Sequence, residues 1–509
     1  MTCVLAIDLG STGVKVAVVD DAGRVLAGAG EVLPLIFTPG GGVEQDANGW
    51  WAAIGRCARQ AVPASGLGAA DITVIAVTSQ YTSTLAVDSA GTPLANTIMW
   101  MDGRGRRNHP AIATAETAPR WIELHGIAPS GNDDLGHVGI IRNLLPDVYA
   151  AAAAFVEPMD AIAARLTGRV TATQNTMFPM LSVDNRTWGA TTYSDELLAM
   201  STLDVAKLPT LVPMGEPRGT VTTAAAEHLG ISPNAIVADA TIDSVTSAVG
   251  TGAIDSSRCG LIIGTTTVMA THLPSKRHDI EHGLTSAPSP LPGTYFLVAE
   301  NGVGGKALDL FVNDIVYPDD GLGLAAPHDA FERVLAAAAS APTGANGVMF
   351  LPWLIGSMAP SYHRRTRAGF VNIGLGTRRA DMARAVIEGV AMNAAWLLPH
   401  FSALAGQQYA EIGFGGGGAG SALWGQTLAD CFGVQVRRLT NSTSTNAHGA
   451  ALLALVALGD VHLEDVPSML TTAALHEPDP AAQAVYADLL PHFVDFHDRA
   501  APFYDSLNS

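Results

Sequence analysis

A turn of small and hydroxyl-bearing residues lies close to the N-terminus, at positions 10–13, between Asp8 and Lys15. Glycine allows backbone N–H groups to approach an oxyanion closely, and serine and threonine hydroxyls add further donors. An aspartate at the end of a strand can hold Mg²⁺, usually through water. These residue types together favour a site for the phosphates of a nucleoside triphosphate. An ordinary hairpin turn is the alternative interpretation, and the Walker A pattern GxxxxGK[ST] does not occur in the chain.

A second turn, Gly264-Thr265-Thr266, follows an apolar run halfway along the chain. Alone, this turn is weak evidence for a phosphate site. The evidence becomes stronger because the chain contains two such turns. Further on, Gly415 to Gly418 remove side chains where a strand leads into a helix, which permits flat contact with a purine or a ribose. A flexible loop is the alternative interpretation of this glycine run.

Phosphoryl transfer to a hydroxyl also needs a group that accepts the hydroxyl proton. Asp243 follows an apolar run that is typical of a strand, and it precedes small residues that suit a closely packed helix. Asp239 lies earlier in the same segment and competes for the same role. For either residue the alternative is a helix N-cap. Spacing alone leaves the choice between the two aspartates open.

Two similar segments must position the two turns. Residues 4–19 and 259–271 share one pattern, an apolar strand, a short hydroxyl-rich turn and a second apolar strand, which indicates a hairpin in each. The repetition predicts a duplicated lobe, with both turns directed into a common cleft. The other expected elements are a central strand at 74–79, an amphipathic helix at 148–168, a helix at 380–404 ended by Gly406, and a strand at 411–418 that ends in the glycine run.

The length of 509 residues is about two to four times that of a common domain and predicts two large lobes with separate cores. Mixed strand and helix patterns predict an α/β architecture for both. We place the boundary near residue 245, which gives an N-terminal lobe at 1–245 and a C-terminal lobe at 246–509.

The composition narrows the class of partner. The net charge of -19 opposes attraction to nucleic acid or to anionic membranes, and the sequence has no basic stripe, so we expect a small-molecule partner. Apolar stretches are interrupted before the roughly 18 to 20 residues that a membrane span needs, and the N-terminus lacks the cationic region of a signal peptide. Four singly spaced cysteines favour buried free thiols in a reducing cytoplasm over disulfides or zinc.

Taken together, these segments resemble the FGGY family of carbohydrate kinases over nearly the whole chain. IDLGSTGVK resembles the first phosphate motif of that family, EQDANGWW (44–51) its xylulokinase-type EQDPxxWW, and PLANTIMWMDGR (93–104) its PLxPAIxWxDxR. Asp243, with Gly250 seven residues later, fits the pattern that carries the catalytic base of the family, and this match selects it over Asp239.

The second half of the chain continues the resemblance in the same order. IGTTT is similar to the second phosphate motif, GVGGKALDLF (302–311) stands where the family has a segment that touches the nucleotide, and residues 350–375 are similar to FLPYLxGERxPxxxxxxxGxFxGL. GGGGAGSALWGQTLAD (415–430) is close to the family's GGGAxSxxWxQxxAD, and AHGAALLA (447–454) is close to the AxGAAxLA that ends the nucleotide lobe.

The resemblance implies two actin-like, ribonuclease-H-like lobes that close over ATP and a sugar, and a homodimer is possible because dimers are common in the family. It implies that Asp243 is the catalytic base and that Asp8 and Asp243 position Mg²⁺. The sugar-binding residues that it implies are Gln80, Tyr81, Thr82, Trp100, Asp102, Asp243 and Ser244, with plain core packing as the alternative for Trp100. The nucleotide-binding residues that it implies are Asp8, Gly10, Ser11, Thr12, Lys15, Gly264, Thr265, Thr266, Gly305, Gly417, Gly418 and Ala419.

The motifs are most similar to those of xylulokinases, which implies conversion of D-xylulose to D-xylulose 5-phosphate. Three segments depart from that pattern. Tyr81 and Thr82 replace the Met and His of GQMHG, Ser244 replaces an Asn, and residues 356–360 read GSMAP where GERTP is expected. Because a site built for one hydroxyl pattern discriminates against others, another ketose or polyol is an alternative acceptor. A sugar and nucleotide sensor and an actin-like ATPase are further alternatives, and the sugar-side motifs disfavour the ATPase.

Overall fold

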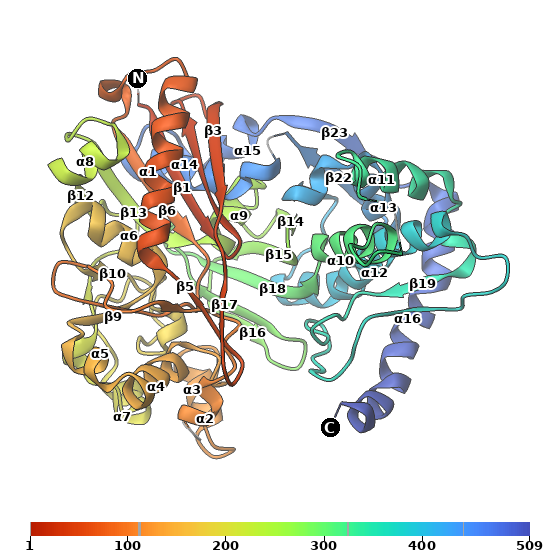
Figure 1. Cartoon of the computed structure of the whole chain (residues 1–509), viewed down its shortest axis with the longest axis horizontal. Coiled ribbons are helices and arrows are strands. Elements are labelled where there is room, and N and C mark those ends of the chain that lie inside the picture. Colours follow the sequence, from red (N-terminus) through yellow and green to blue (C-terminus); the bar gives the residue numbers. More distant parts are fainter. Residues whose placement is uncertain (1, 110–112, 323–324, 441, 509) are drawn as a thin grey trace.

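Two mixed β-sheets form the frame of the protein, and the six strands of the first follow the same order as six of the eight strands of the second (Figure 1). The structure is a computed structural model, and it describes residues 2–109, 113–322, 325–440 and 442–508. The first sheet has the order β12 (Gly219–Thr220), β13 (Ile236–Ile242), β6 (Val74–Ser79), β1 (Val4–Gly10), β2 (Gly13–Val19) and β3 (Val25–Val32). The second has the order β16 (His278–Asp279), β17 (Leu284–Pro288), β18 (Tyr295–Val303), β15 (Thr266–Leu273), β14 (Cys259–Ile263), β21 (Glu411–Gly415), β22 (Gln435–Leu439) and β23 (Thr472–His476).

The connections repeat as well as the order. In the first sheet β1, β2 and β3 form an antiparallel meander, and β6 and β13 then add in parallel on the other side of β1. In the second sheet β14, β15 and β18 form the meander, and β21 and β22 add in parallel beside β14. This repetition confirms the predicted duplicated α/β lobe of the actin-like, ribonuclease-H-like type.

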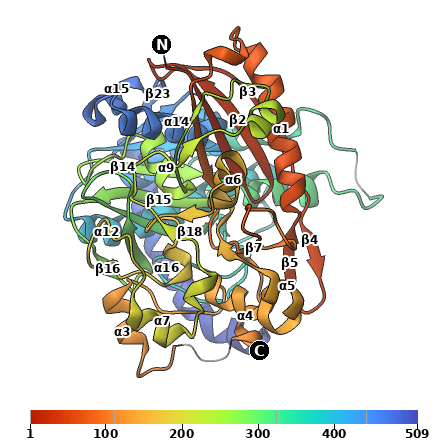
Figure 2. The same ribbon diagram turned by 90° about the vertical axis from the view of Figure 1, so that its left-hand side faces the viewer.

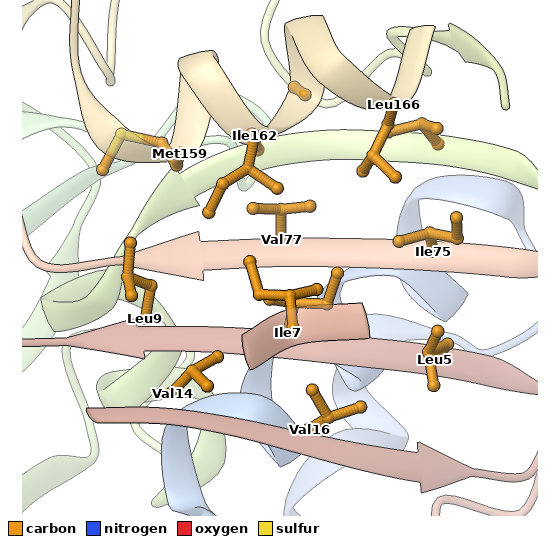
Figure 3. Packing of buried hydrophobic residues seen from close by; sticks show 14 of the residues in the cluster. Leu5, Ile7, Leu9, Val14, Val16, Ile75, Val77, Met159, Ile162 and Leu166 are labelled. Atoms are coloured by element: carbon orange, nitrogen blue, oxygen red, sulfur yellow. The ribbon is translucent and has the colours of Figure 1, made fainter. Parts of the chain in front are cut away.

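The first sheet is buried on both faces because its central strands are apolar at nearly every position. Leu5, Ile7 and Leu9 of β1 point toward one face, where they pack with residues of α1 (Ala47–Ala64) and α6 (Pro158–Thr167). Figure 3 shows these side chains facing Met159, Ile162 and Leu166 of α6. The alternate residues, Val4 and Ala6, face the opposite side.

The second sheet has its own core. Leu261, Ile263, Leu297 and Ala299 pack with residues of α10 (Gly305–Leu310), α12 (Arg379–Ala405) and α13 (Ala422–Phe432). The two sheets give the expected two lobes, but their cores are not wholly separate, because Phe296 and Val298 of β18 pack with the core of the first sheet. The boundary predicted near residue 245 lies inside the helix that joins the two sheets, and it stays a prediction.

Two helices lie between the sheets, and each packs against the sheet to which its preceding strand does not belong. Helix α9 (Asp243–Gly250) follows β13 of the first sheet, yet its Ala248 packs with Ala270 of the second. Helix α14 (Thr445–Leu458) follows β22 of the second sheet, yet its alanines pack against Val4 and Ala6 of the first. In Figure 1, α9 lies near the middle of the molecule, and α14 overlaps the strands of the first sheet.

A mainly helical region lies next to the first sheet and has a third apolar core. It contains α3 (Ala118–Leu124), α4 (Asp134–Leu144), α5 (Pro146–Ala151) and α7 (Asp195–Ser201), which lie together at the lower end of Figure 2. The remaining elements are β4 (Ile36–Thr38), β5 (Gly42–Gln45), β7 (Leu85–Val87), β8 (Thr97–Ile98), α2 (Gly105–Asn108), β9 (Ala154–Val156), β10 (Thr171–Ala172), β11 (Thr210–Leu211), α8 (Thr223–Leu229), α11 (Ala330–Ser340), β19 (Met349–Leu351), β20 (Gly369–Val371), α15 (Val466–Met469) and α16 (Pro480–Leu507).

Most element predictions are confirmed, and one is wrong. The helix expected at 380–404 is α12, which ends at Gly406 in the left-handed conformation. The helix expected at 148–168 is instead α5, strand β9 and α6. The alanine run favours a helix locally, but β9 pairs with β7, and Pro158 fixes the first turn of α6.

Two expectations drawn from the composition concern the state of the cysteines and membrane-spanning helices. All four cysteines are free; Cys3, Cys57 and Cys259 are buried, and Cys431 is half-buried. Among the helices that the structure describes, none combines the length and the apolar character that crossing a bilayer requires.

Candidate functional site

The carboxyl ends of three parallel strands meet at one edge of the first sheet. Leu9 of β1, Ser79 of β6 and Ile242 of β13 lie side by side in register, and the backbone N–H of Gln80 donates to the carbonyl oxygen of Leu9 at 2.8 Å. Because parallel strands end together, the residues next to these three also converge. The fold therefore brings the first turn, Gln80 and Asp243 to one place.

Asp8 and Asp243 face this edge as two carboxyl groups in low-dielectric surroundings. Burial raises the pKa of Asp8 to about 6, although Lys15 and the amide of Asn446 oppose that rise. Burial, followed by the charges of Asp8 and Glu300, raises the pKa of Asp243 well above its usual range. A carboxylate whose pKa is raised is a stronger base, which suits a residue that takes up a proton.

Asp243 begins α9, but it is not a capping residue. The N-cap of α9 is Ile242, and no side chain caps this helix. The carboxylate instead contacts Ser244, whose hydroxyl lies 3.5 Å from Oδ1 and whose backbone N–H also acts on it. The N-cap alternative considered for this aspartate therefore does not apply.

Asp239, the competing aspartate, is committed to a buried ion-pair network. Its Oδ1 accepts a hydrogen bond from Arg218 Nε at 2.8 Å, and the same guanidinium donates to Asp160 through Nη2 at 3.0 Å. Arg218 is fully buried and joins the two carboxylates, so loss of either carboxylate would remove a buried ion-pair partner of this guanidinium. Asp239 has a structural role in this network.

The first phosphate turn is hydrogen-bonded to the predicted sugar segment. The Ser11 hydroxyl donates to Gln80 Oε1 at 2.5 Å and accepts from the indole Nε1 of Trp100 at 2.9 Å. The carbonyl oxygen of Ser11 accepts from Gln45 Nε2 at 2.7 Å, and Gln45 Oε1 accepts from Trp50 Nε1 at 3.1 Å. The Ser11 side chain thus faces the sugar segment, and its N–H remains for phosphate contact.

Tyr81 and Ser244 lie close to Asp243. Burial raises the pKa of the Tyr81 phenol well above its usual range, with Glu300 and Asp243 adding to the rise and the nearby Ser244 hydroxyl opposing it. Thr82 has a φ of 58°, a left-handed conformation that is unusual for a β-branched residue. Strain of this kind is often found where a side chain must be held in a functional position.

Asp102 is buried and already paired. Its Oδ2 accepts from the backbone N–H of Val43 at 2.9 Å and from Arg104 Nη2 at 2.7 Å, and Arg104 also donates to Glu44. Burial alone would raise the pKa of Asp102, but the hydrogen bonds from Arg104 and Val43 outweigh it, so the pKa is lowered. A sugar that contacts this carboxylate must compete with these bonds, and the predicted contact stays a prediction.

The second turn is held by backbone hydrogen bonds. The N–H of Gly305 donates to the carbonyl oxygen of Gly264 at 2.7 Å, and the N–H of Gly304 donates to that of Thr265 at 3.0 Å. A Cβ atom on Gly305 would lie 2.6 Å from the Gly264 oxygen, so only glycine fits this close approach. The Thr265 side chain is exposed and Thr266 is half-buried, as are Gly264 and Gly305.

The glycine run follows β21 and passes beside the second turn. Gly416 has a φ of 83°, and its N–H donates to Thr445 Oγ1 at 3.2 Å. Gly417 is exposed, and a Cβ atom added to it would have open space within 4 Å, while Gly418 and Ala419 are buried against Ile263 and the second-lobe core. Only the backbone of Ala419 can therefore approach a nucleotide.

The residues at the first turn differ in exposure. Gly10 is half-buried and Thr12 is exposed. Lys15 is exposed on the paired strand directly opposite Asp8, where its charge can reach both the carboxylate and a phosphate. These positions agree with a phosphate site at the first turn, which stays a prediction.

Sequence reasoning missed three residues of this region. Gln45 orients the first turn, the Asn446 amide lies between Asp8 and Ser247, and Glu300 acts electrostatically on Asp243. Gln45 stands in the EQDANGWW motif, and Asn446 directly precedes AHGAALLA, so both were close to motifs. Glu300 has the same signal as Asp8, a lone acidic residue at the end of an apolar strand.

Comparison with known proteins gives matches along most of the chain. The N-terminal domain model of the FGGY family of carbohydrate kinases matches residues 3–250, and its C-terminal domain model matches residues 259–458. A xylulose kinase of Staphylococcus epidermidis is 27% identical over 476 residues, covering 90% of this chain and 88% of that protein. A glycerol kinase of Methylibium petroleiphilum is 28% identical, covering 90% and 91%. The crystal structure of a ligand-bound xylulose kinase from Lactobacillus acidophilus shares the fold, with a TM-score of 0.85 at 22% identity and full coverage of both chains.

Proposed function

Because the chain belongs to the FGGY family of carbohydrate kinases and is therefore an ATP-dependent sugar kinase, we propose that it converts D-xylulose to D-xylulose 5-phosphate. The observation that carries the proposal is the pair of carboxyl groups, Asp8 and Asp243, at the edge where the sugar segment and the first phosphate turn meet. Similarity to xylulose kinases supports D-xylulose as the acceptor.

In this mechanism Asp243 acts as the general base. Its carboxylate takes the proton of the attacking sugar hydroxyl, whose oxygen forms a bond to the γ-phosphorus of ATP. The bond from that phosphorus to the β–γ bridging oxygen breaks, and ADP leaves with the electron pair. The raised pKa of Asp243 favours the proton transfer, since it brings the base closer to neutral pH.

The two turns align the nucleotide. Gly10, Ser11 and Thr12 offer N–H and hydroxyl donors on one side, and Gly264, Thr265 and Thr266 offer them on the other. Lys15 adds a positive charge at the first turn, and Gly305, Gly417, Gly418 and Ala419 line the second lobe beside the nucleotide. Catalysis then consists mainly of alignment and charge neutralisation.

Asp8 and Asp243 also fit a magnesium ion. Asp8 Oδ1 is buried and has no hydrogen-bond partner among the described residues, which leaves an acceptor free for a cation. Mg²⁺ in phosphoryl-transfer sites commonly takes one or two carboxylates, with phosphate and water completing its ligands. Bound there, Mg²⁺ would neutralise charge on the phosphates of ATP.

A second acceptor, another ketose or a polyol, is favoured by the residues around Asp243. Tyr81 and Ser244 lie near each other beside the proposed base, where xylulokinase-type sequences have Met and Asn. A glycerol kinase is among the relatives at nearly the same identity as the xylulose kinase. The mechanism is unchanged for such an acceptor, but the hydroxyl pattern that the pocket accepts would differ.

Release of ADP in the presence of single acceptors tests the proposal. D-Xylulose, other ketopentoses, aldopentoses, hexuloses, glycerol and other polyols are supplied one at a time with ATP and Mg²⁺. Strong stimulation by D-xylulose supports the proposal, and stimulation by a different acceptor selects the second candidate. Binding of ATP without stimulation by any acceptor would favour the sensor and refute both kinase assignments.

A further inference from the structure

Glu300 lies within strand β18, three residues before the strand ends at Val303, on the face of the second sheet that meets the first lobe. The side chains of β18 alternate between two cores. Phe296 and Val298 pack with the first-lobe core, whereas Leu297 and Ala299 pack with the second-lobe core. Glu300 continues the series of Phe296 and Val298, so its carboxylate is directed toward the first lobe.

The backbone around Glu300 is fixed by the second turn and its neighbours. Glu300 is paired with Val268, two residues after Thr266, and Val268 packs against the first-lobe core on the same face. A register shift in this strand pair leaves Asn301 as an extra residue. Asn301 Nδ2 donates to the carbonyl oxygen of Ala359 at 2.8 Å, and the N–H of Ala359 donates to that of Glu300 at 3.0 Å.

The neighbours of the Glu300 carboxylate are the groups of the proposed sugar site. Its charge acts on Asp243 and Tyr81 of the first lobe and on Tyr362 of the second. Arg364 acts on Tyr362, but no cation acts on Glu300, and burial alone raises the pKa of this carboxyl to about 7. Within the described residues, no side chain and no backbone N–H donates a hydrogen bond to it.

Such a carboxyl group is costly to the folded protein. A half-buried carboxylate without a hydrogen-bond donor or a counterion loses part of its hydration, and no hydrogen bond or ion pair compensates for that loss. Buried polar groups without partners in the folded protein are rare, and a ligand is one of the things that can supply the partner. The hydroxyls of a sugar or a polyol are hydrogen-bond donors, which is the one function that this carboxylate lacks.

We propose that Glu300 is a sugar-binding residue contributed by the second lobe, whose carboxylate accepts a hydrogen bond from a hydroxyl of the acceptor. The inference rests on the proposed kinase function and narrows its substrate class to uncharged polyhydroxylated molecules. An acceptor that carries a carboxylate, such as an aldonate, would meet like charge from Asp8, Asp243 and Glu300. Because the sugar would then touch both lobes, its binding would also favour their closure over ATP.

Glu300→Gln and Glu300→Ala, made in the full chain, test this role by steady-state ADP release with the acceptor that best stimulates the wild type. A hydrogen bond to a charged group predicts that Glu300→Ala raises the acceptor KM about 10- to 100-fold, and that Glu300→Gln gives a smaller rise. The KM for ATP and the acceptor-independent release of ADP should change less than about threefold. Glu281→Gln, on an exposed loop of the same lobe, is the matched control and should leave all values unchanged.

Thermal unfolding separates this role from a structural one. Removal of a carboxyl that lacks partners should leave Tm unchanged or raise it, whereas loss of a structural contact would lower it.

A charged acceptor tests the same inference with the wild type. D-Gluconate should stimulate ADP release from the wild type at least tenfold less than the best uncharged acceptor.

Two outcomes would overturn the role of Glu300. An acceptor KM that stays within twofold in Glu300→Ala, or a better turnover with D-gluconate than with uncharged acceptors, refutes it while the kinase function stands. If no acceptor stimulates the wild type, the kinase function itself fails and the role of Glu300 falls with it.

Discussion

Six strands follow the same order in the two lobes. The turns at residues 10–13 and 264–266, however, are held in place by different kinds of hydrogen bond. The first turn is fixed by side chains, since the Ser11 hydroxyl bonds to Gln80 and Trp100. The second turn is fixed by backbone, since the N–H groups of Gly304 and Gly305 bond to the carbonyl oxygens of Thr265 and Gly264. This difference fits the two tasks that we propose, acceptor recognition with acid–base chemistry in the first lobe and a nucleotide site with few side chains in the second.

Asp243→Asn should have the largest effect and should act on the chemistry of the first lobe alone. The amide keeps the shape of the side chain but cannot take up the hydroxyl proton, so kcat should fall about 10²- to 10⁴-fold. The KM for ATP should stay within a few-fold, because the second-lobe cradle is intact. Steady-state ADP release measures both constants, and Asp239→Asn is a contrasting variant that should lower Tm instead, since it breaks the ion pair with Arg218. Acceptor-stimulated kcat retained in Asp243→Asn would refute its role as base.

Gly305→Ala should break the cradle of the second lobe and spare the acceptor. The new Cβ would lie 2.6 Å from the Gly264 carbonyl oxygen, and such overpacking costs about 1–3 kcal/mol. We expect the KM for ATP to rise about 10- to 100-fold, with a smaller change in the KM for the acceptor. Gly417→Ala is the control, because its Cβ has open space, so any loss of ATP affinity there reports contact with the nucleotide itself. An unchanged KM for ATP in Gly305→Ala would separate this turn from nucleotide binding.

Ser11→Ala should uncouple the first turn from the acceptor. The change removes the hydrogen bonds to Gln80 and Trp100 but keeps the Ser11 backbone, so the ratio of acceptor-stimulated to acceptor-independent ADP release should fall about 3- to 10-fold. Ser11→Thr keeps the hydroxyl and should retain most of the ratio. A ratio that falls equally in both variants would point to packing at the turn as the cause.

Thr82→Asn should give the smallest effect. It compares two threonines of the first lobe that both have a positive φ, one in the proposed sugar segment and one away from it. Asparagine tolerates the left-handed conformation better than threonine, so unfolding should become harder by about 0.5–1 kcal/mol. Thr202→Asn is the matched control, because Thr202 has a φ of 56° at the end of α7, away from the sugar segment. Both variants should gain stability in urea unfolding, but only Thr82→Asn should raise the acceptor KM. A KM change in both, or in neither, would contradict a sugar contact by Thr82.

The two strand–turn–strand segments could be predicted from the sequence, because they depend on local patterns. An apolar strand followed by a turn of small residues is visible in residues 4–19 and 259–271, and parallel strands bring Asp243 beside the first turn. The sequence could not separate alanines that form a helix from those of β9, because pairing with β7 decides the outcome.

Long-range side-chain contacts in the site were not predictable for the same reason. The hydrogen bond from the Val43 N–H to Asp102 depends on strand β5, which lies 59 residues earlier in the sequence. The approach of Glu300 to Asp243 depends on how the two sheets face each other, which no local pattern encodes. Neither a motif nor a periodicity marks such contacts.

The helices between the sheets also decide how the chain can be divided. A fragment that ends after α9 would lack α14, and Val4, Ala6 and the other apolar residues on that face of the first sheet would be left in water. The remaining fragment would in turn lack α9 against Ala270. Gly449 and Gly250 allow α14 and α9 to pack with almost no space between their backbones. A cut in the segment 251–258 would thus give two pieces that are insoluble when made separately and that restore one kinase only when they are produced together.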